Sequence, residues 1–261
     1  MSGVPSLPAD TERHNWLERP GDDFPYYRGR PVEIPTGGWL LVLIGVAVGF
    51  FVLTQGPRFA SGLPARFLLA FLYSAIPLAA LAIVAGGHWR ALFRPLRGVD
   101  ALWMIGFALL NIAVTLLVGQ ITVRVMDTTA NSAIAGVGHM AGSDRLAFFA
   151  LTGIQLFGEE VMSTLPFLAL MYWLCGRGGI GRKTAIAIAT LIVALLFAAE
   201  HLPTYHWNVL QTLMGVGVAR IVLLLPYLMT KNLLVSAGTH ILNDWIFFGI
   251  SILAAATAHD P

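Results

Sequence analysis

The sequence contains few charged residues. Only 11% of its 261 residues are Asp, Glu, Lys or Arg, whereas 57% are hydrophobic, and the formal net charge is +2. A soluble domain usually carries about 25% charged residues. This shortage excludes an ordinary soluble domain and indicates a protein that spans a membrane several times. The sequence also lacks a basic cluster interleaved with aromatic residues, so nucleic acid is not an expected partner.

Cysteine is almost absent as well. The single cysteine, Cys175, excludes a disulfide within the chain and leaves the redox compartment open. The first 38 residues lack the charged start and the apolar stretch of a cleavable signal peptide. No internal repeat and no low-complexity segment occurs in the sequence.

The N-terminal segment differs in composition from the rest. Residues 1–38 are polar and rich in proline, which predicts an extended arm ahead of a helical membrane domain over residues 39–257. Such a segment is as often disordered as ordered. The aromatic cluster at 24–27, together with Trp16, offers an alternative, in which the arm docks on the membrane surface or on a stable membrane-protein partner.

Seven apolar stretches are candidates for membrane spans, since a spanning helix needs about 20 predominantly apolar residues. They cover residues 39–55, 67–87, 101–123, 146–174, 184–199, 207–229 and 233–256. The predicted fold class is therefore an all-α polytopic membrane protein with about seven transmembrane helices and a polar N-terminal arm, in contact with membrane lipid.

Basic residues between the spans favour one orientation. If seven helices alternate across the membrane, eleven basic residues fall on the side of the N-terminus and four on the other. Because Lys and Arg are enriched in cytoplasmic loops, we expect the N-terminus in the cytoplasm. Fourteen arginines against two lysines favour a GC-rich genome, and hence the cytoplasmic (inner) membrane of a bacterium.

Two adjacent carboxylates, Glu159 and Glu160, interrupt the fourth apolar stretch. An ionisable side chain at the bilayer centre costs about 2.5–3.5 kcal/mol on insertion scales, so the pair must face protein or water and have partners. The other ionisable residues within or at the ends of the C-terminal spans are Glu200, His201, Arg220, His240 and Asp244.

Carboxylates and imidazoles around water in a membrane cavity have a chemical use. A carboxylate can take a proton from water, and an imidazole can hold that water or stabilise an oxyanion. Alternatively, Glu159, His201 and His240 can bind a divalent metal such as zinc that activates the water. The spacing does not separate these two options, although the His-Glu-x-x-His signature of many zinc proteases is absent.

Three motifs stand in order on successive spans, at 159–164, 197–201 and 240–244. They resemble the Glu-Glu-x-x-x-Arg, Phe-x-x-x-His and His-x-x-x-Asn motifs of the CAAX prenyl-protease and bacteriocin-processing (CPBP, or abortive-infection) family. The resemblance covers about residues 147–248. It implies an intramembrane endopeptidase that hydrolyses a peptide bond at or near the membrane, in a membrane-associated peptide or protein substrate.

The same resemblance implies roles for individual residues. Glu159 would activate the water, with Glu160 as its neighbour, and His201 and His240 would position the water and stabilise the oxyanion. The candidate catalytic residues are Glu159, Glu160, His201, His240 and Asp244. The candidate supporting residues are Phe197, Asn243, Arg220, Thr164 and Glu200.

The sequence departs from the family motifs in three places. Thr164 stands where the motif has Arg, and the nearest substitute inside the membrane is Arg220, which we expect to neutralise one carboxylate. Asp244 stands where the motif has Asn, unless Asn243 replaces it. Glu200, beside His201, would make the site more acidic.

These departures keep other classes of function open. The first alternative is a catalytically silent protein of the same fold that acts as a subunit, assembly factor or immunity protein of a membrane complex. A pigment protein with His201 or His240 as axial ligand is another. A transporter with a carboxylate proton relay is a third, against which the lack of repeat symmetry counts.

The predicted topology leaves a problem of depth. His201 lies at the outer end of the fifth span, whereas His240 lies about 12 Å inside the cytoplasmic end of the seventh, at 1.5 Å per residue. The family resemblance requires the two imidazoles to converge. A short or tilted helix, or a deep cavity, would be needed to bring them together.

Overall fold

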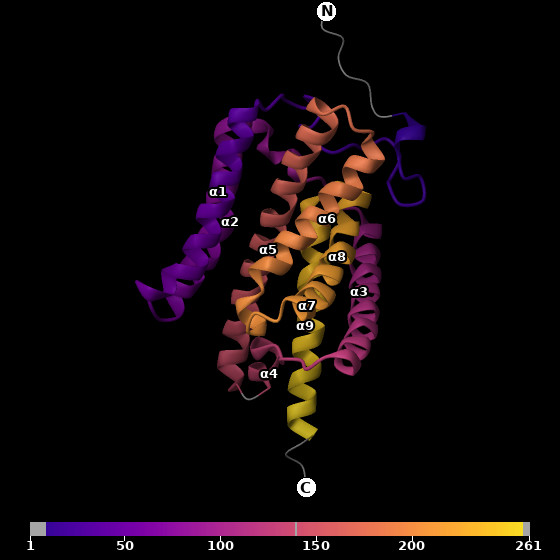
Figure 1. Ribbon diagram of the computed structural model, residues 1–261. Coiled ribbons are helices and arrows are strands. Elements are labelled where there is room, and N and C mark those ends of the chain that lie inside the picture. Colours follow the sequence, from indigo (N-terminus) through magenta and orange to yellow (C-terminus); the bar gives the residue numbers. More distant parts are fainter. Residues whose placement is uncertain (1–8, 139, 258–261) are drawn as a thin grey trace, which may run out of the picture.

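The structure is a computed structural model that describes residues 9–138 and 140–257. Within these residues the regular structure is helical throughout, and no strand occurs. Figure 1 shows the long helices gathered into a bundle, with the N-terminal arm crossing its upper end. The prediction of an all-α fold is confirmed.

Seven long helical segments coincide with the seven predicted spans. They are α1 (Thr36–Gln55), α2 (Leu63–Ala85), α3 (Gly98–Val125), α5 (Gly142–Met171), α6 (Arg182–Glu200), α8 (Val218–Thr230) and α9 (Leu233–Thr257). The short helix α7 (Val209–Thr212) and the π-helical η6 (Leu213–Gly217) run into α8 and complete the sixth span. Another short helix, α4 (Ser132–Val137), lies between the third and fourth predicted spans.

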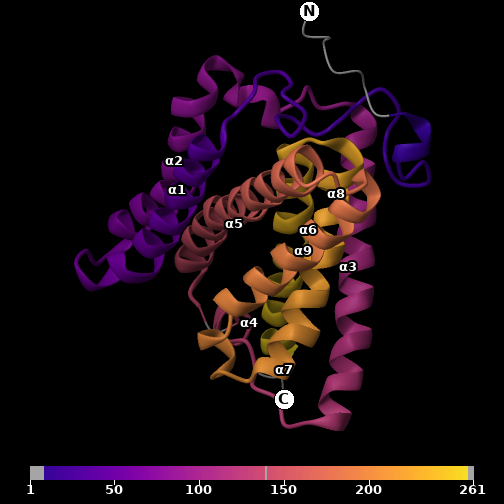
Figure 2. The same ribbon diagram turned by 45° about the horizontal axis from the view of Figure 1, so that its top comes forward.

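Six of the spans are long and apolar enough to cross a membrane by themselves, and α5 is not among them. Its residues 158–165 are all buried, including Glu159 and Glu160. Figure 2 shows α5 between the α1–α2 pair and the group of α6, α8, α9 and α3. The neighbouring helices therefore shield its acidic pair from lipid, so α5 does not need the hydropathy of an isolated span.

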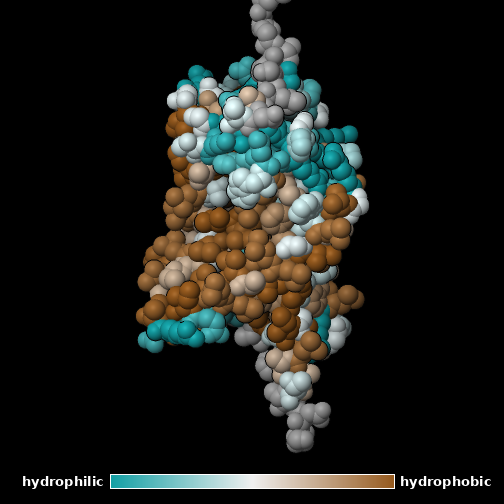
Figure 3. Space-filling view, turned by 90° about the vertical axis from the view of Figure 1, so that its right-hand side faces the viewer, coloured by the Kyte–Doolittle hydropathy of each residue, from teal (hydrophilic) through white to brown (hydrophobic). Residues whose placement is uncertain are grey.

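The outer surface of the bundle carries many exposed apolar side chains. On α3, for example, Leu102, Leu116 and Leu117 are each more than half exposed. Figure 3 shows a broad hydrophobic belt on one face of the molecule, with hydrophilic surface above it and a narrower hydrophilic zone below. A belt of this extent is covered by lipid rather than water. The chain is an integral membrane protein.

The described part of the arm packs against one end of the bundle, here called the arm end; the opposite end, near α4, is the α4 end. Phe24, Tyr26 and Tyr27 are 0–3% exposed. The Phe24 ring lies between Phe167 of α5 and Tyr227 of α8, with centroid distances of 5.2 and 5.9 Å. The aromatic cluster thus contacts the chain's own helices, which close the core at this end.

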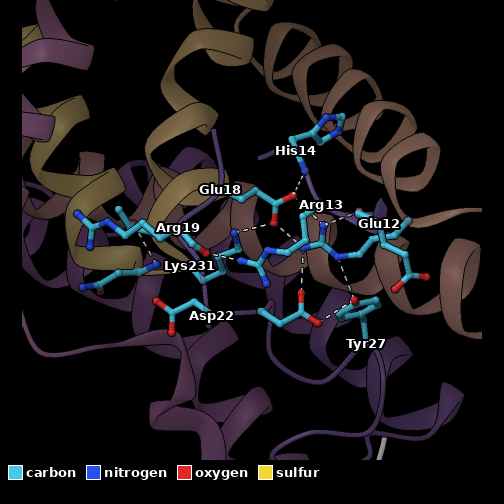
Figure 4. Close-up of polar contacts among 12 residues, drawn as sticks. Glu12, Arg13, His14, Glu18, Arg19, Asp22, Tyr27 and Lys231 are labelled. Atoms are coloured by element: carbon cyan, nitrogen blue, oxygen red, sulfur yellow. Dashed lines mark hydrogen bonds and ion pairs between the residues drawn. The ribbon is translucent and has the colours of Figure 1, made fainter. Parts of the chain in front are cut away.

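A buried ionic cluster fixes the arm. Glu18, 5% exposed, accepts hydrogen bonds from both terminal nitrogens of Arg182, at 2.7 and 2.6 Å, and from Nζ of Lys231, at 2.7 Å. Figure 4 shows Glu18 and Lys231 among these contacts. Arg182 begins α6 and Lys231 lies between α8 and α9, so a single carboxylate joins the arm to three helix ends.

Candidate functional site

A cavity of about 570 Å³ lies inside the bundle between α3, α5, α6, α8 and α9. It brings together four of the five candidate catalytic residues and two of the candidate supporting residues. Those side chains are Glu159, His201, His240, Asp244, Phe197 and Asn243. The convergence that the resemblance required is present.

The depth problem is resolved because the end of α6 lies beside His240. Phe197, in the last turn of α6, and His201, which directly follows the helix and precedes η5 (Pro203–Tyr205), line the same cavity as His240. The ring of Phe197 lies against both imidazoles, with centroid distances of 4.6 Å to His201 and 6.2 Å to His240. An aromatic side chain one turn before His201 therefore bridges the two histidines.

Glu160 is fully buried and fully engaged. Its carboxylate receives two hydrogen bonds from the Arg220 guanidinium and one from the Ser236 hydroxyl. Its Oε1 also lies 2.8 Å from Nδ1 of His240. The expectation that Arg220 neutralises one carboxylate agrees with this geometry. Arg220 of α8 thus supplies the cation that the family motif has at position 164. Thr164 itself is buried, and its hydroxyl has no hydrogen-bond partner among the described residues.

Glu159, one residue earlier, is placed differently. It lines the cavity, and its Oε1 accepts a single hydrogen bond from Nε2 of Gln155 at 3.2 Å. Its Oε2 lies 3.9 Å from Nε2 of His240. The other lone-pair regions of this carboxylate therefore remain available to a molecule in the cavity.

In both histidines, Nδ1 is paired with an oxygen of the protein, and Nε2 is left for other partners. Nδ1 of His201 lies 2.8 Å from the carbonyl oxygen of Phe197, which can only accept a hydrogen bond. His201 therefore carries a proton on Nδ1, and in its neutral form its Nε2 is an acceptor. Nδ1 of His240 faces Glu160, which leaves its Nε2 near Glu159 and 3.7 Å from Oδ1 of Asp244.

Asp244 and Asn243 both line the cavity, and Asp244 is the one near His240. Nδ2 of Asn243 donates to Asp244 at 2.9 Å, and Oδ1 of Asn243 accepts from Asn111 at 3.0 Å. Asn111 belongs to α3 and lines the same cavity. Asn111 was not among the predicted site residues, because those were chosen around ionisable groups in the C-terminal spans. Its position, as an amide in the middle of the third apolar stretch, was the feature of the sequence that indicated it.

Glu200 does not line this cavity. It faces a second cavity between α1, α5 and α6, and Phe197 is common to both. Glu200 therefore lies outside the cavity that its neighbour His201 lines, and the expectation that it makes the site more acidic stays a prediction. Consecutive residues at a helix end point in different directions, which explains why His201 and Glu200 separate.

A metal centre was the other chemical option for the site. Across residues 9–138 and 140–257, no group of three or more His, Cys, Asp or Glu side chains is arranged to hold a metal ion. The set Glu159, His201 and His240 thus does not fit a zinc site in this geometry.

The fold and the cavity define a polytopic membrane protein with a buried acid–imidazole site. Residues 141–246 match the family model described as Type II CAAX prenyl endopeptidase Rce1-like. The resemblance to the CPBP family is confirmed for these residues, which run from the start of α5 into α9. The match includes all ten candidate residues but not Asn111. Comparisons with curated proteins and with solved structures give no match.

Proposed function

We propose that this protein is an intramembrane endopeptidase that hydrolyses a peptide bond at or near the membrane. The observation that carries the proposal is the different environment of the two adjacent carboxylates. Glu160 is saturated by Arg220, Ser236 and His240, whereas Glu159 faces the cavity with one amide partner. A carboxylate free to bind water beside imidazoles is what general-base hydrolysis requires.

In the proposed reaction, Glu159 takes a proton from a water molecule while the water oxygen attacks the scissile carbonyl carbon. The acceptor Nε2 of His201 orients that water. The carbonyl π electrons move to the oxygen, and His240, as an imidazolium held at Nδ1 by Glu160, donates its Nε2–H to this oxyanion. When the C–N bond breaks, Glu159 returns the proton to the leaving amine.

We further infer that the substrate approaches from the α4 end. Exposure of the lining residues rises in that direction, from buried Glu159 and His240 through half-buried Thr204 and Tyr205 to exposed Arg66. At the arm end, Phe24, Phe167 and Tyr227 close the bundle. With the N-terminus in the cytoplasm of a bacterium, the cavity opens away from the cytoplasm.

The test is hydrolysis by the purified protein in lipid nanodiscs, with peptides released from membrane-anchored substrates identified by mass spectrometry. Glu159→Gln is expected to lower the cleavage rate roughly 10²–10⁴-fold, the usual range for a general base. Asp144→Asn, an exposed acid at the start of the same helix, is the matched control and retains the wild-type rate. Cleavage by Glu159→Gln at the wild-type rate contradicts the proposal.

One observation favours a second candidate, a catalytically silent subunit, assembly factor or immunity protein. Asp244 places a carboxylate near His240 where the family motif has an amide donor, which removes a hydrogen-bond donor for an oxyanion. This candidate predicts that Glu159→Gln retains the cellular phenotype and that the protein copurifies with a stable partner. With Phe24 and Tyr27 buried, the arm offers Trp16, 79% exposed, as its aromatic contact.

A further inference from the structure

A second cavity, of about 350 Å³, lies between α1, α5 and α6. Its lining is apolar except for Ser163 and Glu200. The Ser163 hydroxyl already donates to the backbone oxygen of Glu159 at 2.9 Å. Glu200, half-buried at the end of α6, is therefore the charged group of an otherwise hydrophobic lining.

Glu200 has no hydrogen bond and no ion pair with any residue in the described part of the chain. Glu160, by comparison, has three partners within the chain. Glu200 is also the last residue of α6, where the helix dipole disfavours a negative charge. An unpartnered carboxylate in apolar surroundings is costly, so a partner from outside the chain would stabilise it.

The shape of the cavity narrows the choice of partner. Along α6 the lining extends from Ile192 to Glu200, and along α5 from Met162 to Leu170. Eight residues of α-helix span about 12 Å at 1.5 Å per residue. On α6 the carboxylate lies at one end of this slot, and apolar side chains occupy the rest. A linear alkyl chain with a polar head at one end matches that arrangement.

The charge of Glu200 and the aromatic lining indicate which polar head group the bound molecule carries. A carboxylate accepts hydrogen bonds from an ammonium group, whereas it repels a fatty acid and gains less from a neutral alcohol. The ring of Phe50 also lines the cavity, and aromatic faces attract cations.

We propose that this cavity binds a single-chain aliphatic amine, with the ammonium group on Glu200 and the chain between α1, α5 and α6. Such a molecule reaches the cavity from the bilayer, where its chain is soluble. This cavity is a different one from the cavity that holds Glu159, although Phe197 lines both, and its occupancy does not depend on peptidase activity.

The experiment measures saturable binding of radiolabelled decylamine to the purified protein in phosphatidylcholine nanodiscs, with empty nanodiscs as the background. Unlabelled decylamine is expected to displace the label at concentrations at least tenfold lower than decanol or decanoate. Glu200→Gln is expected to weaken decylamine at least tenfold and to leave decanol unchanged. Asp144→Asn, an exposed acid on α5, is the matched control and binds like the wild type.

A second variant keeps the test valid if Glu200→Gln does not fold. Val46→Phe places a larger side chain in the lining from α1 without touching the carboxylate, and it is expected to lower binding of decylamine. If unlabelled decylamine and decanol displace the label from the wild type at equal concentrations, the amine only partitions into the lipid, and the proposal is overturned. Unchanged amine binding in a folded Glu200→Gln variant would overturn it too.

Discussion

Adjacent residues on a helix point about 100° apart, and the acidic pair of α5 uses this difference. Glu160 points toward α8 and α9, where Arg220, Ser236 and His240 receive it. Glu159 points into the cavity. At the residue scale, one carboxylate thus holds the helices and an imidazole in place, and the other is available for chemistry.

Arg220 is the residue whose loss we expect to be most damaging to stability. Arg220→Met leaves Glu160 as a buried charge without its cation, and breaking such a pair costs about 3–5 kcal/mol. The expected result is a clearly lower thermal unfolding midpoint in detergent. The double variant Glu160→Gln with Arg220→Met is expected to recover part of the loss. A double variant less stable than Arg220→Met alone would contradict this account of the pair.

Asp244→Asn restores the amide of the family motif beside His240. If the oxyanion forms there, the new N–H donor is expected to raise the rate of peptide hydrolysis, by up to roughly 10²-fold. The rate is measured with the same peptides as for the wild type, and Asp144→Asn again serves as the control. A lower rate in Asp244→Asn would show that the carboxylate itself is needed.

At the scale of elements, Glu18 of the arm holds the helix ends together through its ion pairs with Arg182 and Lys231. Burial raises the pKa of the Glu18 carboxyl, but hydrogen bonds from Arg182 and the charge of Lys231 outweigh burial and lower it to about 2. Burial in turn lowers the pKa of Lys231 to about 8, against the opposing charge of Glu18. The cluster therefore depends on an ionised Glu18.

The stabilisation from Glu18 follows from that shift in pKa. Because the folded-state pKa lies below the ordinary value of 4.5, its contribution is fully present above about pH 4.5 and is lost as the pH falls toward 2. We expect amide hydrogen exchange in the arm to become faster, relative to its intrinsic rate, across this window. Amides of the arm that stay equally protected from pH 5 to pH 2 would contradict this role of Glu18.

Glu18→Gln tests the same contact at neutral pH. The variant leaves Arg182 and Lys231 buried without their anion, so the arm is expected to loosen and trypsin to cut within it faster than in the wild type. Glu33→Gln, an exposed acid of the same arm, is the control. Equal rates of cleavage in Glu18→Gln and in the wild type would contradict the role of the cluster.

At the scale of the whole molecule, the arm packs over one end of the bundle, and the exposure of the residues that line the cavity rises toward the α4 end. The predicted orientation can be measured without activity in a Cys175→Ser background, since Cys175 is the sole cysteine. A membrane-impermeant maleimide is expected to label Ser61→Cys, in the loop between α1 and α2, on intact spheroplasts. Trp16→Cys is expected to react only after lysis. The reverse pattern would place the cavity mouth in the cytoplasm.

The sequence by itself determined the spans, because the thickness of the bilayer sets the length of an apolar stretch and leaves few alternatives. It also indicated the resemblance to the CPBP family, through three short motifs, and Arg220 as the missing cation. Only the tertiary structure assigned different environments to Glu159 and Glu160, brought Asn111 and Ser236 to the site, and separated Glu200 from His201. These outcomes depend on which face each helix turns toward its neighbours, and that orientation is fixed by packing among distant segments.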